Sequence, residues 1–247
     1  MSICSEKIKL DYEFDIVIKK TTESTNKEAK ELFLKNRKNV LVIAEEQTAG
    51  RGRFDRKFSS PEGKGIYMSL AFSVSDFFKE FSYITPFAAV AVSQAIRKIY
   101  HVEPKIKWVN DVYINNKKVC GILSEIVFCQ SQPDFVIVGI GVNVHKYTFE
   151  DELKQIATSI ENECEFVSSR NKLVSEIVNV FLSMKDNETI LGEYRKNSLI
   201  IGKNVTVYSG NDIFEAYVED IDKNANLVVR TDFGKRTINA GEVSIKL

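Results

Sequence analysis

The sequence of 247 residues has little of what builds metal centres or disulfide frameworks. It contains only two histidines, His101 and His145, and four cysteines that show no CxxC spacing. Isolated residues of this kind predict neither a zinc site nor a disulfide framework. We therefore expect four reduced thiols, and structural or surface roles for the two histidines.

The sequence also lacks an excess of charge of either sign. The 34 lysines and arginines balance 34 aspartates and glutamates, whereas a protein that binds nucleic acid normally carries a basic excess. No apolar run approaches the roughly 20 residues of a membrane span, and residues 1–10 lack the apolar core of a signal peptide. These absences predict a cytoplasmic protein that binds neither nucleic acid nor a membrane.

Two kinds of hydrophobic pattern alternate along residues 1–197. Short runs rich in β-branched and aromatic residues predict strands, and apolar residues at helical spacing predict helices. The predicted strands are residues 14–19, 40–44, 65–74, 105–108, 118–128 and 135–144, with 113–114 as a hairpin partner across Asn115-Asn116. Helices are predicted to start at a capping box of Thr25 and Glu28, at Thr85-Pro86 and at Ser169.

The pattern changes after Tyr194-Arg195. Short strands alternate there with the turn dipeptides Gly210-Asn211, Lys223-Asn224 and Phe233-Gly234. This spacing predicts a small β-barrel over residues 198–247, after a larger domain of residues 1–197.

Alternating glycine and arginine residues, Gly50-Arg51-Gly52-Arg53, stand between two predicted strands. Glycine permits close backbone approach, and arginine supplies charge-assisted hydrogen bonds to carboxylates and phosphates. In an electroneutral chain this local charge favours a site for a small anion. A solvated loop or a nucleic-acid contact is the alternative interpretation of such a run.

Three further polar segments accompany this loop: 24–26, 107–111 with 117–121, and 139–143. In this order and spacing the four segments resemble the biotin–protein ligases over nearly the whole chain. The family pattern GRGRxGRxW corresponds to residues 50–58, where Asp55 replaces the third glycine and Phe58 the tryptophan. The family pattern KWPND corresponds to residues 107–111, with Val109 in place of proline.

The resemblance implies an α+β fold like that of class II aminoacyl-tRNA synthetases and biotin synthetases: a mixed β-sheet flanked by helices, plus a C-terminal SH3-like β-barrel. It implies that the protein uses ATP and Mg²⁺ to convert biotin to biotinyl-5′-AMP. It also implies transfer of biotin to one lysine of a biotin carboxyl carrier protein, a subunit of acetyl-CoA carboxylase or of another biotin-dependent carboxylase.

The resemblance also implies roles for individual residues. Lys118 would bridge the biotin carboxylate and the α-phosphate, Arg53 would contact both anions, and Asp111 would orient the acceptor amine or assist Mg²⁺. The implied biotin-binding residues are Ser24, Thr25, Asn26, Gln47, Gly50, Arg51, Arg53, Lys118 and Gly121. The implied nucleotide-binding residues are Arg51, Arg53, Arg56, Lys57, Phe58, Trp108, Asn110, Asn143 and Lys246. The sequence does not identify the metal ligands.

Several of these residues have simpler interpretations. Ser24 and Thr25 also read as helix caps, Asn143 as a turn residue, Trp108 as a core residue and Lys246 as a surface residue.

Other functions are open on sequence grounds. A lipoate–protein ligase shares the fold and the adenylation chemistry, but its typical RRxSGGG stretch is absent here. A non-catalytic nucleotide or RNA binder is a second alternative. The chain shows no winged helix-turn-helix of the repressor type, so we expect no binding to operator DNA. An edge strand of the main sheet offers a surface for a homodimer.

Overall fold

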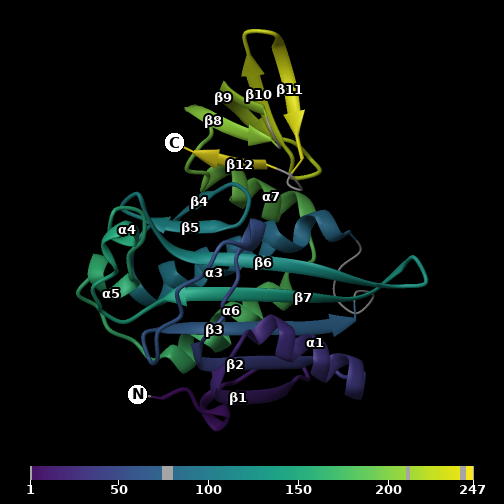
Figure 1. The fold of residues 1–247 in the computed structure, drawn as a ribbon, viewed down its shortest axis with the longest axis vertical. Coiled ribbons are helices and arrows are strands. Elements are labelled where there is room, and N and C mark those ends of the chain that lie inside the picture. Colours follow the sequence, from purple (N-terminus) through teal and green to yellow (C-terminus); the bar gives the residue numbers. More distant parts are fainter. Residues whose placement is uncertain (1, 74–79, 210–211, 240–242, 247) are drawn as a thin grey trace.

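The computed structural model describes residues 2–73, 80–209, 212–239 and 243–246, and its larger part is a seven-stranded sheet (Figure 1). The strands lie in the order β1-β2-β3-β7-β6-β5-β4. Their bounds are β1 Asp15–Thr22, β2 Val40–Gln47, β3 Gly65–Ser73, β4 Lys105–Lys107, β5 Asp111–Ile114, β6 Lys117–Cys129 and β7 Gln132–Asn143. β1 and β2 are parallel and all other neighbours are antiparallel, so the predicted mixed sheet is confirmed.

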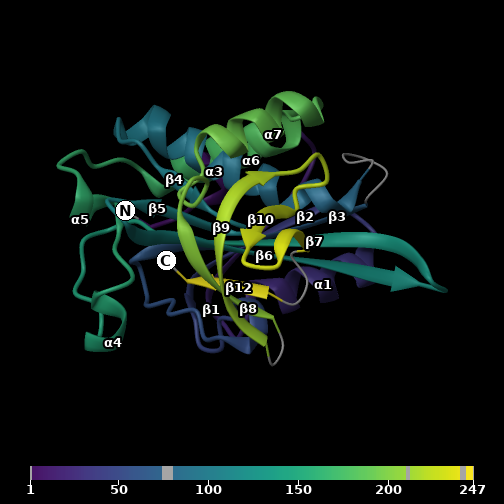
Figure 2. The same ribbon diagram turned by 90° about the horizontal axis from the view of Figure 1, so that it is seen from above.

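Helices cover both faces of the main sheet. The α-helices are α1 Thr25–Asn36, α3 Ile84–Tyr100, α4 Asp151–Lys154, α5 Ile160–Glu163, α6 Arg170–Ser183 and α7 Asn187–Lys196; the 3-10 helices are η1 Ser5–Lys7, η2 Arg53–Asp55 and η3 Phe81–Tyr83. α1 lies on one face, and α3 and α6 lie on the other (Figures 1 and 2). Alternation along β2 explains this: Val40 and Val42 pack under α1, whereas Leu41 and Ile43 join the larger core with α3 and α6.

The central part of the sheet agrees with the sequence pattern. β7 lies between β3 and β6, and its nearly continuous apolar run is typical of a strand that is covered on both faces. The hairpin of β5 and β6 turns at Asn115 and Asn116, whose φ angles of 49° and 63° are typical of a two-residue type I′ turn.

The helix starts differ in detail from the prediction. α3 begins at Ile84 with Tyr83 as its N-cap, so Thr85 lies inside the helix and donates to Ser124 Oγ at 2.9 Å. Ser169 is the N-cap of α6 as predicted, but without a capping side-chain hydrogen bond. Helix α7 was not predicted.

The predicted capping box of Thr25 and Glu28 is wrong. Ser24 has the N-cap backbone conformation of α1, and it makes no capping hydrogen bond. Instead, the amide of Thr25 donates to Gln47 Oε1 at 2.8 Å. A side chain from β2 thus satisfies a first-turn donor that a local cap usually satisfies.

The C-terminal part is a five-stranded antiparallel sheet in the order β11-β10-β9-β8-β12. Its strands are β8 Asn204–Ser209, β9 Asp212–Ile221, β10 Leu227–Thr231, β11 Gly234–Ile238 and β12 Val243–Lys246. This is the small β domain expected, although in its described residues the edge strands β11 and β12 do not pair to close a barrel. The predicted turn at Gly210-Asn211 lies outside the described residues.

The two parts share one hydrophobic core. Trp108 Nε1 donates to the carbonyl of Ala225 at 2.9 Å, and the hydroxyl of Tyr83 donates to the carbonyl of Lys223. Because packing is continuous across residue 197, the domain boundary predicted there stays a prediction.

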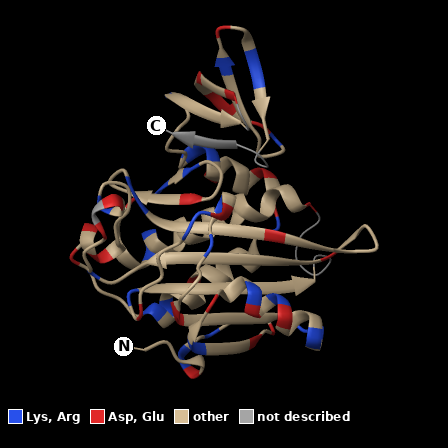
Figure 3. Cartoon of the chain, viewed as in Figure 1, with Lys and Arg blue, Asp and Glu red and all other residues tan. Residues whose placement is uncertain are grey.

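The described residues contain no helix with the length and apolar character needed to span a membrane. In the view of Figure 3, basic and acidic residues are interspersed over both described parts.

Candidate functional site

The face of the sheet that carries α1 has a hollow beside the start of that helix. Under α1 this face bears the large side chains of Phe135 and Ile137. Further along the strands the same face presents Gly139 and Gly141 on β7, and Ser69, which pairs with Gly139, on β3. Because these residues have little or no side chain, they leave room for a cavity of about 650 Å³.

Most of the predicted site residues line this cavity. They are Ser24, Thr25, Asn26, Gln47, Arg51, Arg53, Arg56, Lys57, Phe58, Trp108, Asn110, Asp111, Lys118, Gly121 and Asn143. Gly50 is buried and is not part of the lining. Lys246 belongs to β12, and its side chain lies outside the described part of the chain.

A chain of hydrogen bonds fixes the polar side chains near the start of α1. Gln47 Oε1 lies 2.8 Å from the amide nitrogen and 3.0 Å from Oγ1 of Thr25, and Gln47 Nε2 donates to Ser60 Oγ at 3.0 Å. Ser60 donates in turn to the carbonyl of Phe58 at 3.1 Å. A neutral ligand group with both donors and acceptors would find fixed partners here.

Residues 50–58, the arginine loop, fold back on themselves. The amide of Phe58 donates to the carbonyl of Gly50 at 2.9 Å, and the amide of Gly52 donates to the carbonyl of Arg56 at 2.7 Å. A Cβ atom on Gly50 would lie 2.6 Å from the carbonyl oxygen of Phe58, so this closure requires glycine.

The tip of the arginine loop has left-handed backbone. Phe54 and Asp55 have φ angles of 57° and 53°. Asp55 stands where the family pattern has glycine, which adopts this conformation without the steric cost of a Cβ atom. Asp55 in place of glycine therefore lowers the stability of the loop in this conformation.

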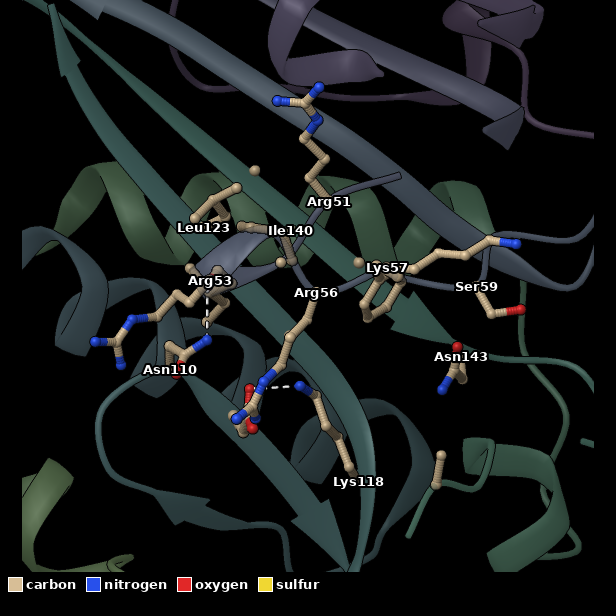
Figure 4. A pocket seen from close by; sticks show the side chains of 18 of the residues that line it. Arg51, Arg53, Arg56, Lys57, Ser59, Asn110, Lys118, Leu123, Ile140 and Asn143 are labelled. Carbon is tan, nitrogen blue, oxygen red and sulfur yellow. Dashed lines mark hydrogen bonds and ion pairs between the residues drawn. The ribbon is translucent and has the colours of Figure 1, made fainter. Parts of the chain in front are cut away.

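Four cations and one carboxylate, which we call the basic cluster, lie in the cavity wall: Arg53, Arg56, Lys107, Lys118 and Asp111. Lys118 Nζ lies 2.7 Å from Asp111 Oδ1. Asp111 on β5 stands opposite Lys107 on β4 in the register of these two strands. The side chain of Arg56 extends in the direction of Lys118, whereas those of Arg51 and Lys57 extend away from it (Figure 4). This excess of positive charge suits a ligand with several negative charges.

The basic cluster is partly removed from solvent. Burial lowers the pKa of Lys107, with smaller contributions from Lys118 and Arg56, and Asp111 opposes this shift. Burial likewise lowers the pKa of Arg53, again against the influence of Asp111. Poorly solvated cations attract an anionic ligand more strongly than cations in bulk water.

The ring of Phe58 lies over a floor made of glycine. Gly121 and Gly141 pair across β6 and β7. A Cβ atom on Gly141 would lie 2.4 Å from Phe58 Cε1, and one on Gly121 would lie 3.2 Å from Phe58 Cε2 and from Lys118 Nζ. Glycine at both positions therefore allows an aromatic ring and the lysine to approach the sheet.

Three residues predicted to contact the nucleotide have structural partners. Trp108 is 4% exposed and bonds to Ala225 of the small sheet, so it is chiefly a core residue whose edge reaches the cavity. Asn110 Nδ2 donates to the carbonyl of Ile122 at 2.9 Å, and Asn143 Nδ2 donates to that of Thr158 at 3.1 Å. The peptide bond between Trp108 and Val109 is cis.

Comparison with known proteins agrees with this geometry. Residues 16–143 match the biotin/lipoate A/B protein ligase family, and residues 200–246 match the biotin protein ligase C-terminal domain. The chain belongs to the biotin/lipoate A/B protein ligase family.

Relatives within this ligase family cover most of the chain. The bifunctional ligase/repressor BirA of Bacillus subtilis is 34% identical over 231 residues, which are 90% of this chain and 71% of the relative. The biotin–[acetyl-CoA-carboxylase] ligase of Mycobacterium tuberculosis is 31% identical over 217 residues, which cover 83% of this chain and 78% of the relative. The solved biotin protein ligase of Aquifex aeolicus in complex with biotin and ATP matches with a TM-score of 0.81 and 26% identity, covering 94% of this chain and 98% of that one.

Sequence reasoning missed several residues of the ligase site. Gly139 and Gly141 belong to the segment 139–143 that the sequence singled out, but they were given no role, although glycines two apart in an apolar strand lie on one face. Ser69 carried a readable signal, as a lone polar residue amid the apolar part of β3. Ser69 lies behind the lining, whereas Ile156 and Tyr208 belong to it and had no local signal, since only the tertiary fold brings them there.

Proposed function

We propose that this chain is a biotin–protein ligase that activates biotin with ATP to biotinyl-5′-AMP and transfers biotin to a lysine of a biotin carboxyl carrier protein. One observation carries the proposal: in a member of the ligase family, a single cavity joins the Thr25–Gln47 polar group to the basic cluster. The polar group suits the ureido ring of biotin, and the cations suit its carboxylate and the phosphates of ATP.

In the first step, a carboxylate oxygen of biotin bonds to the α-phosphorus of ATP, and the bond from that phosphorus to the leaving pyrophosphate breaks. Two anions approach each other, so the charge that accumulates must be neutralised. Lys118 is proposed to bridge the carboxylate and the α-phosphate, and Arg53 and Arg56 to hold the phosphate oxygens. To do so, Lys118 must leave its ion pair with Asp111 and form an ion pair with the ligand.

In the second step, the amine of the acceptor lysine attacks the acyl carbon, the bond to AMP breaks, and the amine loses a proton. Asp111 is proposed to orient this amine once Lys118 is engaged with the ligand. The arginine loop is proposed to cover the adenylate, because a mixed anhydride survives only where water is excluded.

The remaining predicted contacts keep their proposed roles. Biotin is expected to contact Ser24, Thr25, Asn26, Gln47, Arg51 and Gly121, whereas Gly50, which does not line the cavity, is expected to act by letting the arginine loop close. The nucleotide is expected to contact Arg51, Arg56, Lys57, Phe58, Trp108, Asn110, Asn143 and Lys246, besides Arg53. In the described part of the chain, no group of three or more His, Cys, Asp or Glu side chains is placed to hold a metal. Mg²⁺ is commonly bound through one or two carboxylates plus substrate phosphates, so it would fit here as an ion that arrives with ATP, to which Asp111 would supply a carboxylate oxygen.

Several expectations about partners and place are part of the proposal. The carrier belongs to acetyl-CoA carboxylase or to another biotin-dependent carboxylase, and the protein acts in the cytoplasm without binding operator DNA. A homodimer would form through β1, an edge of the main sheet, because the other edge strand, β4, already bonds through Ile106 to Asn197 and Leu199. Sedimentation with and without biotin and ATP tests the dimer.

The proposal is tested by pyrophosphate release that depends on biotin and by incorporation of labelled biotin into a carboxyl carrier domain. Biotin with ATP should raise the melting temperature because a ligand that binds the native state stabilises it. Lipoate with ATP should leave the melting temperature unchanged. Pyrophosphate release with lipoate but not with biotin would assign the chain to the lipoate ligases, and binding without release would indicate a non-catalytic binder.

A further inference from the structure

Ser69 lies at the centre of β3, is 0% exposed and does not line the cavity. Its Oγ lies 2.7 Å from Thr25 Oγ1 and 2.6 Å from Asn26 Oδ1. Thr25 and Asn26 do line the cavity. Ser69 can therefore act on a ligand only through these two neighbours.

The partners of the two amide side chains fix their orientation. The backbone amide of Thr25 can only donate, so the Gln47 atom 2.8 Å from it is the carbonyl oxygen Oε1. The carboxylate of Glu125 accepts, so the Asn26 atom 2.6 Å from it is the nitrogen Nδ2. Asn26 Oδ1 consequently faces Ser69.

Three contacts between oxygen atoms then compete for two hydroxyl protons. Thr25 Oγ1 lies 3.0 Å from Gln47 Oε1 and 2.7 Å from Ser69 Oγ, and Ser69 Oγ lies 2.6 Å from Asn26 Oδ1. Each hydroxyl supplies one proton, so one contact has none. Two oxygen atoms without a proton between them repel each other least when they are farthest apart. The longest of the three distances is that between Thr25 Oγ1 and Gln47 Oε1, so this contact is the one without a proton. Thr25 then donates to Ser69, and Ser69 donates to Asn26.

We infer that Ser69 is a positioning residue that draws the Thr25 proton away from Gln47 and leaves Thr25 Oγ1 and Gln47 Oε1 as paired acceptors for an N–H group of the ligand. The inference rests on the proposed function, since the ureido ring of biotin carries two N–H groups. A ligand N–H that binds both oxygens relieves their repulsion. A ligand with a methylated nitrogen at this place cannot, so Ser69 contributes to the selection of the ligand.

The test is the affinity of the Ser69→Ala variant for biotin. Without Ser69, the Thr25 proton turns to Gln47 and the acceptor pair is lost. Loss of one good hydrogen bond should raise the Kd for biotin about tenfold, while kcat at saturating biotin and the KM for ATP stay within about twofold. Ser69→Cys retains a hydrogen-bond donor, although a weaker one on a larger atom, so its Kd for biotin should lie between those of wild type and Ser69→Ala.

Ser93→Ala is the matched control. Ser93 is a buried serine of α3 that is 1% exposed, and within the described part of the chain its hydroxyl has no hydrogen-bond partner. The same substitution there should leave the Kd for biotin unchanged. It also reports how far loss of a buried hydroxyl alone affects the melting temperature.

Two further measurements distinguish positioning from a structural effect. In a Thr25→Val background, Ser69→Ala should have no additional effect on the Kd, because the acceptor that Ser69 controls is already gone. The preference for biotin over an N-methylated biotin should fall by the same factor as the affinity. Additive effects of the two substitutions, or an unchanged preference, would overturn the inference. Wild-type protein without biotin-dependent pyrophosphate release would instead overturn the proposed function.

Discussion

Lys118 Nζ and Asp111 Oδ1 are 2.7 Å apart in the wall of the cavity, with side chains 29% and 20% exposed. The pair lies in a cluster with three further cations, so the lysine can move to a ligand anion without leaving the carboxylate unneutralised. The same move frees the carboxylate for an incoming amine. One ion pair thus links the proposed roles of these residues in the two steps of the reaction.

Replacing Lys118 by alanine should lower kcat for biotin-dependent pyrophosphate release about 100-fold to 1000-fold, as expected for loss of one group that stabilises transition-state charge. The partly exposed ion pair contributes about 1 kcal/mol or less to stability, so the variant should stay folded. Lys117→Ala is the control, because the lysine at that position does not line the cavity. Equal rates in Lys118→Ala and wild type would remove Lys118 from the mechanism.

Arg53→Gly should release the adenylate faster than wild type, because Arg53 extends from the arginine loop within the basic cluster. Arg51→Gly changes the same loop at a side chain that extends away from Lys118, so its effect on release should be smaller (Figure 4). A stopped-flow chase of preformed biotinyl-AMP measures both rates. The same release rate in wild type and Arg53→Gly would exclude the proposed retention role.

Gly141→Ala should impair nucleotide binding, because the new Cβ atom would lie 2.4 Å from Phe58 Cε1 and must displace the ring. Gly192→Ala is the matched control: Gly192 is an exposed position of helix α7, and its Cβ atom would have no heavy atom within 4 Å apart from the backbone of its own helix and its chain neighbours. Alanine there should raise the free energy of unfolding by about 0.5–1 kcal/mol. The KM for ATP of both variants measures nucleotide binding, and chemical denaturation of both measures the free energy of unfolding. An unchanged KM for ATP in Gly141→Ala would show that the position of Phe58 does not affect nucleotide binding.

Lys107→Met should stabilise the protein at neutral pH, because burial lowers the pKa of Lys107 and the charged form is therefore disfavoured in the folded state. Between the lowered pKa and the ordinary value the unfolded chain binds more protons, so wild-type stability rises with pH there. The advantage of Lys107→Met should consequently shrink as pH rises through the folded-state pKa. Urea denaturation at neutral and alkaline pH measures the difference, and a constant advantage at all pH values would contradict this account.

Local sequence patterns predicted the strands of the main sheet because residue type and alternation act over a few neighbouring positions. They misplaced the cap of α1, since the partner of its first amide is Gln47, which is distant in sequence. They also missed α7, and they placed the N-cap of α3 at Thr85 rather than Tyr83.

By itself the sequence determined the strands of the main sheet, the small C-terminal β domain, the glycine–arginine loop and the ligase family, because each depends on residue types at fixed spacing along the chain. The tertiary structure decided how the site is supported. Ser69 beneath Thr25, Phe58 over Gly141 and Trp108 against Ala225 join segments far apart in the chain. Their contacts depend on strand register and on the packing of the two domains, which no local pattern specifies.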